Sequence, residues 1–165
     1  MCCPTKENKR NWWPFVATMA FVILIRLFVF ELCRVDGQSM EPTYHSKALL
    51  GVCKLHHSYE VGDVVVLKDP VKGRTLIKRI VAKPFDEVKI KEDALYVNGK
   101  LVSSYGKGKT IEENPKYSYM MLQDGEYYVL GDNREDSLDS RSFGGVKSSS
   151  IIGKVFATIL KGEMP

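Results

Sequence analysis

An apolar run close to the N-terminus constrains the fold of this chain more than any other feature. Residues 12–32 read WWPFVATMAFVILIRLFVFEL, and about 20 helical residues are enough to cross the hydrocarbon core of a bilayer. The run has no polar face, so it differs from a surface helix, and no small-residue cleavage motif follows it. We therefore predict a transmembrane anchor at 12–32, in preference to a cleaved secretory signal or a buried helix of a soluble core.

The charges around the run predict its direction. Three basic residues lie shortly before it and two tryptophans begin it. Basic residues tend to stay on the cytoplasmic side, and tryptophans favour the membrane interface. Residues 1–11 are therefore expected to form a cytoplasmic tail, and residues 33–165 a domain outside the cytoplasm. Arg26 lies near the far end of the run, where its long side chain can reach the interface.

Composition indicates one folded domain after this segment. The chain has 165 residues, of which 44% are hydrophobic and 27% are charged, as in ordinary folded proteins. That length leaves room for a single domain of about 100–150 residues. Residues 31–165 contain 20 Lys and Arg against 19 Asp and Glu. This balance leaves no basic surface for nucleic acid.

The four cysteines do not form a recognisable framework. Cys2 and Cys3 lie at the N-terminus, where they are either unmodified or acylated beside a membrane. Cys33 and Cys53 are more simply explained as two free thiols than as a disulfide. Neither the cysteines nor the three histidines have the spacing of a metal site. We expect no metal and no cofactor.

The rest of the chain predicts a mainly β domain. After residue 45, short apolar or alternating runs are separated by turn residues. The expected strands lie near Leu49–Lys54, Val64–Leu67, Leu76–Ala82, Glu87–Ile90, Leu95–Val97, Leu101–Val102, Tyr127–Leu130 and Gly153–Leu160. Asn98-Gly99 is the strongest hairpin signal. Residues 103–123 show no periodic pattern and are expected to be a loop or a small appended lobe.

A lysine within the run LIKRI is the first candidate for chemistry. In an extended strand Leu76, Lys78 and Ile80 share one face. If that face is buried, desolvation lowers the pKa of the amine from about 10.4. A value of about 7–8 would make the amine a usable base. On these five residues alone, the alternative with Lys78 exposed and Ile77 buried is favoured.

Two polar stretches are the other candidates. Ser39 lies between a glycine and a Glu-Pro pair in GQSMEPT, so it is either ordinary turn chemistry or a nucleophile with a fixed backbone path. The stretch GDNREDSLDSRSFG follows an apolar strand, and its Ser137, Asp139 and Arg141 are spaced so that they could brace one another. The alternative for this stretch is a solvated loop held by local hydrogen bonds.

Other familiar patterns carry less weight. GKGKT at residues 106–110 lacks the first glycine of a phosphate loop and the strand before it. Ser104 and Lys107 match S-x-x-K without its accompanying motifs. A Ser-His-Asp triad finds no support in the motifs or in chain order.

Taken together, the motifs point to one family. GQSMEPT after a single anchor, then GDVVV, LIKRIVA and GDNREDSLDSRSFG occur in this order. In this respect the chain resembles the bacterial type I signal peptidases, membrane-bound enzymes that cleave signal peptides from exported preproteins. Its small size and single anchor are similar to the enzymes of Gram-positive bacteria. The resemblance implies a catalytic domain built on a coiled antiparallel β-sheet.

The resemblance also implies roles for individual residues. Ser39 would be the nucleophile and Lys78 its general base, with the Ser39 backbone N–H helping to stabilise the oxyanion. Ser137 would hydrogen-bond to Lys78 and orient it. The remaining supporting residues would be Asp139, Arg141, Asp132 and Arg79. Some family members carry a serine where this chain has Gly37, so a second oxyanion donor would be backbone or water.

The implied substrate is the end of a signal peptide, bound as an added strand with small residues in shallow pockets. The expected pocket walls are Met40, Tyr44, Leu76 and Ile77. The implied partners are exported preproteins, the lipid bilayer and a nearby export translocon. Two other functions stay open: a self-cleaving Ser-Lys repressor, which would carry a DNA-binding helix-turn-helix in place of the anchor, and a membrane-tethered β-module that only binds secreted partners.

Overall fold

The computed structural model describes residues 11–55 and 58–162. The expected cytoplasmic tail, including Cys2 and Cys3, lies almost wholly outside the described residues. Helix α1 spans Trp13–Phe28, and strand β1, Phe30–Arg34, follows it directly. Of the helices that the structure describes, none combines the length and the apolar character needed to cross a membrane.

The predicted helix over 12–32 is therefore wrong at its C-terminal end. Residues 30–34 pair antiparallel with strand β2, Leu49–Cys53, over their whole length. Their alternation of apolar and polar side chains suits a strand that lies on the edge of a sheet. Arg26 marks the end of the helix, because its guanidinium donates a hydrogen bond to the Phe30 carbonyl at 2.9 Å.

The described part of the β-domain contains ten strands after β1. Their bounds are β2 Leu49–Cys53, β3 Val64–Lys68, β4 Thr75–Ala82, β5 Glu87–Lys91, β6 Ala94–Val97, β7 Lys100–Leu101, β8 Tyr119–Met121, β9 Glu126–Leu130, β10 Val146–Lys147 and β11 Ile151–Leu160. All eight predicted strands are present, with ends within two residues of those expected. The short helices are η1 Pro115–Tyr117, α2 Ser140–Phe143 and η2 Ser148–Ser150.

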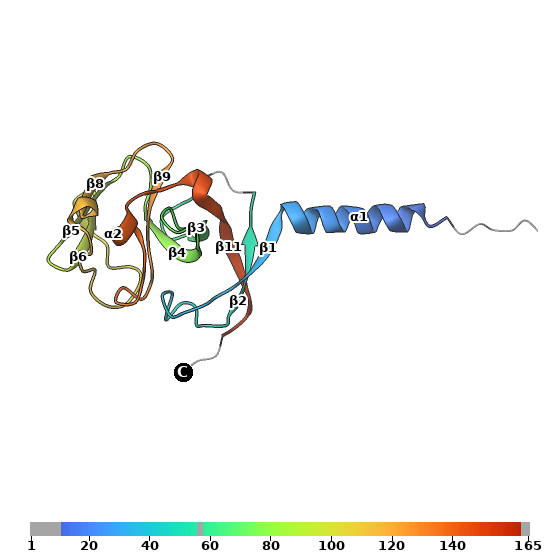
Figure 1. Ribbon diagram of the computed structural model, residues 1–165, viewed down its shortest axis with the longest axis horizontal. Coiled ribbons are helices and arrows are strands. Elements are labelled where there is room, and N and C mark those ends of the chain that lie inside the picture. Colours follow the sequence, from blue (N-terminus) through green and yellow to red (C-terminus); the bar gives the residue numbers. More distant parts are fainter. Residues whose placement is uncertain (1–10, 56–57, 163–165) are drawn as a thin grey trace, which may run out of the picture.

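These strands form two antiparallel sheets, so the mainly β class is confirmed. The larger sheet has seven strands in the order β1-β2-β11-β3-β4-β9-β10, and the smaller has four in the order β7-β6-β5-β8. Helix α1 projects from the larger sheet, and the smaller sheet lies at the opposite end of the domain (Figure 1). The predicted hairpin at Asn98-Gly99 joins β6 to β7, with both φ angles positive at 51° and 74° as a type I′ turn requires.

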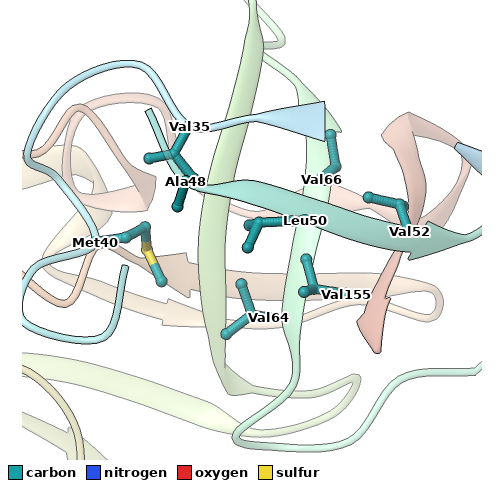
Figure 2. Packing of buried hydrophobic residues seen from close by; sticks show 8 residues of the cluster. All are labelled: Val35, Met40, Ala48, Leu50, Val52, Val64, Val66 and Val155. Atoms are coloured by element: carbon teal, nitrogen blue, oxygen red, sulfur yellow. The ribbon is translucent and has the colours of Figure 1, made fainter. Parts of the chain in front are cut away.

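Buried apolar clusters hold the two sheets and the chain around Ser39 together. One cluster fills the space between β2, β3 and β11, and Met40 packs into it from the loop after β1 (Figure 2). Met40 is only 1% exposed, and burying a side chain of this kind contributes about 1.5–3 kcal/mol. The residue next to Ser39 therefore anchors the loop. Another cluster joins the sheets through Val81 and Tyr128 on one side and Val88 and Leu95 on the other.

Cys33 and Cys53 are free thiols. The β1–β2 register places Phe30 opposite Cys53 and Leu50 opposite Cys33. The two cysteines are therefore three positions apart along the ladder. An odd offset puts them on opposite faces of the sheet, because side chains alternate along a strand. This geometry rules out a disulfide between them in this fold.

Candidate active site

Strand β4 carries Lys78 into the interior of the domain. Lys78 is paired with Val65 on β3, and its side chain is only 2% exposed. The interpretation with an exposed lysine is therefore wrong. Its Nζ donates a hydrogen bond of 2.7 Å to the Oγ of Ser39, which lies 39 positions earlier in the chain. The fold thus brings together the two residues on which the family resemblance depends.

Burial changes the acidity of this amine. Desolvation lowers the pKa of Lys78 from 10.5 to about 8, and the negative charge of Asp139 opposes that fall without cancelling it. At pH 7 an ordinary lysine is neutral in about one molecule in 2,500, whereas a pKa of about 8 raises this to about one in ten. A neutral amine can accept the hydroxyl proton across the same 2.7 Å contact.

Backbone contacts fix the position of Ser39. The Asn133 N–H donates to the Ser39 carbonyl at 3.0 Å, while buried Met40 holds the next residue. Gly37 has a φ of 94°, a backbone region that favours glycine. The departure from a serine at position 37 therefore has a conformational reason here.

A hydrogen-bonded fork joins the loop after Ser39 to strand β4. Arg79 donates from Nε to Asp132 Oδ1 at 2.8 Å and from Nη2 to Oδ2 at 2.6 Å. Thr43 donates its hydroxyl to the same carboxylate at 2.5 Å. The bond to Asp132 raises the pKa of Arg79 further, although burial opposes the rise. Because Arg79 follows Lys78 and Thr43 follows Ser39 closely in sequence, this carboxylate ties the two sides of the site together.

A second buried ion pair lies behind the site. Asp139 and Arg141 are 0% and 2% exposed, and Arg141 Nε donates to Asp139 Oδ1 at 2.8 Å. The other oxygen of Asp139 accepts from the Gly131 N–H at 3.0 Å. Arg141 Nη2 also donates to the Ser137 carbonyl at 3.1 Å. These contacts fix the turn from β9 into the stretch that packs on Ser39.

Ser137 does not make the expected hydrogen bond to Lys78. Its Oγ is buried and has no hydrogen-bond partner among the described residues. The Lys78 amine is directed at Ser39 instead. The Ser137 side chain lies against Gly131, where even an added Cβ would collide with it. The prediction that Ser137 orients Lys78 through a direct hydrogen bond is wrong for this structure.

A groove of about 340 Å³ opens beside Ser39 and Lys78. Three of the four expected pocket walls line it: Met40, Leu76 and Ile77. Tyr44 does not, because the turn after Ser39 carries it to a separate hollow shared with Pro42 and Thr43. The opposite wall comes from residues 31–36. The prediction from sequence misses this wall because it places residues 31 and 32 at the end of the anchor and includes no strand over residues 33–36, although the alternating pattern of residues 30–34 is a signal for a strand.

The other candidate patterns lie elsewhere. The Lys107 amine is 3.5 Å from Glu41, so the Ser104-Lys107 pattern forms no second dyad. His45 Nδ1 lies 3.7 Å from a carboxylate oxygen of Glu41, and His56 and His57 lie outside the described residues. Within the described ranges no group of three or more metal-ligating side chains occurs.

A serine hydroxyl beside a buried, partly neutral lysine defines the chemistry of a Ser-Lys hydrolase. Comparison with known proteins identifies the family. A family profile described as "Signal peptidase, peptidase S26" matches residues 9–160, and the chain belongs to this family.

Individual relatives agree with the family profile. The chain is 36% identical to signal peptidase I of Bacillus caldolyticus, over 91% of this chain and 90% of the relative. It is 35% identical to signal peptidase I T of Bacillus subtilis, over 90% and 84% of the two chains. The crystal structure of a signal peptidase I from Enterococcus faecalis superimposes with a TM-score of 0.50 at 30% identity, covering 60% of this chain and 97% of that chain.

Proposed function

We propose that this protein is a serine endopeptidase that cleaves signal peptides from exported preproteins, with Ser39 as the nucleophile and Lys78 as the general base. The observation that carries the proposal is the 2.7 Å contact between Lys78 Nζ and Ser39 Oγ at the floor of a groove. Membership of the signal peptidase family supports the choice of substrate.

The contact supports a two-step hydrolysis. Neutral Lys78 takes the hydroxyl proton as Ser39 Oγ attacks the carbonyl carbon of the scissile bond. The protonated amine then gives this proton to the leaving nitrogen, which leaves an acyl-enzyme. A water molecule attacks the ester carbonyl while Lys78 accepts one of its protons, and Lys78 then gives this proton to the departing Ser39 Oγ, which restores the hydroxyl and the neutral amine. The Ser39 N–H is proposed as one oxyanion donor, with backbone or water as the second, because Gly37 has no side chain.

Two free strand edges support binding of the peptide as an added strand. Strand β1 is the last strand of its sheet, and the pairing of β4 with β9 begins only at Arg79. Among the residues that the structure describes, residues 75–78 therefore have no ladder partner on the side of the groove. An extended peptide can use both edges through main-chain hydrogen bonds. Met40 and Ile77 then face its side chains, which favours small residues at the −1 and −3 positions.

Exposed apolar surface supports a location at a lipid bilayer. No residue of α1 is buried, and Phe30 and Leu32 on β1 and Phe156 on β11 are 38%, 47% and 56% exposed. Strand β2 lies between β1 and β11, but the Phe30 and Phe156 rings are 5.5 Å apart from centroid to centroid. Exposed apolar side chains in this number are usually covered in the cell. We propose that the segment from α1 into β1 associates with the bilayer, with residues 1–11 in the cytoplasm and residues 33–165 as the catalytic domain outside it.

This arrangement would hold the site near the export translocon, where cleavage regions emerge. Its topology is tested by adding protease to intact spheroplasts. Degradation of the domain is expected, and full protection would contradict the proposal.

Peptide cleavage tests the activity directly. A preprotein with Ala-x-Ala before the scissile bond should be cleaved by the full chain in detergent. Ser39→Ala and Lys78→Met should each lower kcat by at least about 10³-fold with the fold intact. The matched controls Ser104→Ala and Lys89→Ala, both at exposed positions, should retain wild-type rates. Substantial turnover by either dyad variant would reject the assignment, and absence of wild-type turnover would favour a binding module.

The alternative function, a self-cleaving repressor, predicts a different structure before the β-domain. A self-cleaving Ser-Lys repressor would carry a helix-turn-helix before its β-domain. Here the one helix described before the domain, α1, runs directly into strand β1. That arrangement favours the signal peptidase.

A further inference from the structure

The aperiodic segment after β7 is bound to the active site by its backbone. Lys107 donates its N–H to the Asp132 carbonyl at 2.7 Å, and its own carbonyl accepts from the Arg134 N–H at 3.1 Å. This pattern is an isolated parallel bridge between Lys107 and Asn133. The Asn133 N–H is the group that holds the Ser39 carbonyl. Residues 105–108, here called the strap, therefore hydrogen-bond to residues 132–134. That segment in turn holds the backbone of Ser39 through the Asn133 N–H.

The first residue of the strap is held at both its backbone and its ring. The Tyr105 carbonyl accepts a 2.6 Å hydrogen bond from Nη2 of Arg134, a side chain that is only 3% exposed. The Tyr105 ring lies under the Arg79 guanidinium, 4.8 Å from ring centroid to Cζ. This is the same guanidinium that forms the fork with Asp132.

Close packing leaves the strap little freedom. Gly106 has a φ of 89°, and a Cβ added there would lie 2.6 Å from the Asp132 carbonyl oxygen. The strap thus approaches the Asp132 backbone as closely as a glycine allows. It does not line the groove beside Ser39. Any effect of the strap on cleavage must therefore act through other residues.

We propose that the strap holds Ser39 within reach of Lys78, and that Tyr105 is a positioning residue that acts through the Arg79–Asp132 fork. This inference rests on the proposed function. The ring covers one face of the Arg79 guanidinium. This contact favours the orientation in which the guanidinium donates two hydrogen bonds to the Asp132 carboxylate. The carboxylate fixes Thr43, and the backbone next to it fixes Ser39. Displacement of a reacting group by about 1 Å is enough to slow catalysis about 10²-fold.

Kinetics of three ring variants test the proposal. Tyr105→Ala should lower kcat at least about tenfold with KM changed less than about twofold, because the strap does not contact the substrate. Tyr105→Leu keeps apolar bulk without a π face and should behave like Tyr105→Ala; it is also the measurable variant if the alanine protein is unstable. Tyr105→Phe keeps the ring and should restore at least half of the wild-type kcat. The control Tyr119→Ala, at a tyrosine 61% exposed on β8, should match wild type.

A double-variant cycle with Arg79→Lys tests the route. Lysine keeps the charge at position 79 but has neither the fork nor the planar face. If Tyr105 acts through Arg79, adding Tyr105→Ala to Arg79→Lys should lower kcat by less than about twofold more. Full additivity of the two effects would overturn this route, as would a wild-type kcat in Tyr105→Ala or a failure of Tyr105→Phe to rescue.

Amide hydrogen exchange gives a readout that does not require turnover. The Asn133 N–H, which is bonded to the Ser39 carbonyl, should exchange at least about tenfold faster in Tyr105→Ala than in wild type or Tyr119→Ala. Unchanged exchange would overturn the positioning role even if the enzyme is active. If the wild-type protein cleaves nothing but this exchange accelerates as expected, the proposed function fails while the structural role of the strap stands.

Discussion

The Lys78 amine and the Ser39 hydroxyl lie 2.7 Å apart, and the amine reaches this position from a strand on which its side chain is almost fully buried. Burial of the lysine and its contact with the Ser39 hydroxyl make separate contributions to its role as a base. Burial removes hydration from the ammonium form and favours loss of the proton. The contact supplies an acceptor for the N–H group and, once the amine is neutral, a hydroxyl proton to take.

This balance predicts the pH dependence of cleavage. The base must be neutral to accept a proton, and its pKa is about 8. We expect kcat/KM to rise about tenfold per pH unit below 8 and to level off above it. Initial rates measured from pH 6 to 10 on a peptide without titrating groups near the cleavage site check this. An acid limb with its midpoint near 10.5 would mean that the lysine is not desolvated in the working enzyme.

The same burial predicts that the lysine lowers stability at neutral pH. The folded-state pKa of Lys78 lies below its unfolded value, so folding is penalised in full below pH 8. Between pH 8 and 10.5 the unfolded chain binds more protons, and stability rises until the penalty is gone. Lys78→Met, of similar shape, should therefore be more stable than wild type at pH 7 by about 1–3 kcal/mol.

The comparison of urea denaturation curves at pH 7 and pH 10 checks this sign. The advantage of Lys78→Met should shrink as the pH rises. The exposed control Lys89→Met should show no such trend, and a destabilised Lys78→Met at pH 7 would contradict the expectation.

The sequence predicts the catalytic pair better than it predicts the residues that line the groove beside that pair. The eight strands followed from apolar alternation and turn residues, and the residue types of Ser39 and Lys78 carried the family resemblance. The burial of Lys78 did not follow, because the run LIKRI alternates equally well with either face inside. Which face is covered depends on the chain that packs against β4 in the folded protein, where Lys78 is 2% exposed and Ile77 is only partly buried.

Other errors came from treating neighbours in sequence as neighbours in space. Tyr44 was placed in the groove because it follows Ser39 closely, but the turn between them reverses the chain. The predicted anchor includes residues 30–32, the first part of strand β1, because their apolar content continues that of α1. Tyr105 lies in a stretch without periodicity, and its role depends on Arg79 and Arg134, which meet it only in the folded protein.

Gly131 is predicted to be essential for a steric reason. A Cβ at this position would lie 2.6 Å from the Ser39 carbonyl oxygen and would collide with the Ser137 side chain. Gly131→Ala must therefore displace the nucleophile, and we expect kcat to fall about 10²-fold or more, with a loss of about 1–3 kcal/mol in stability. Gly145→Ala is the matched control, since its nearest neighbours are side-chain atoms at 3.3–3.5 Å. Equal activity of the two variants would contradict the prediction, because it would show that the loop around Ser39 can accommodate the added methyl group without displacing the nucleophile.

The buried pair behind the site predicts a large loss of stability when it is broken. Arg141→Met removes the cation that faces Asp139, whose side chain is 0% exposed, and leaves a buried carboxylate with only neutral donors. Breaking such a pair typically reduces stability by about 3–5 kcal/mol.

The exposed pair of Lys109 and Asp93, with side chains 71% and 47% exposed at 3.2 Å, provides the control for that prediction. Lys109→Met should change stability by less than about 1 kcal/mol. The two free energies of unfolding are compared by urea denaturation at pH 7. A loss as small as that of Lys109→Met would mean that the Gly131 amide and the helix α2 backbone alone stabilise the Asp139 carboxylate.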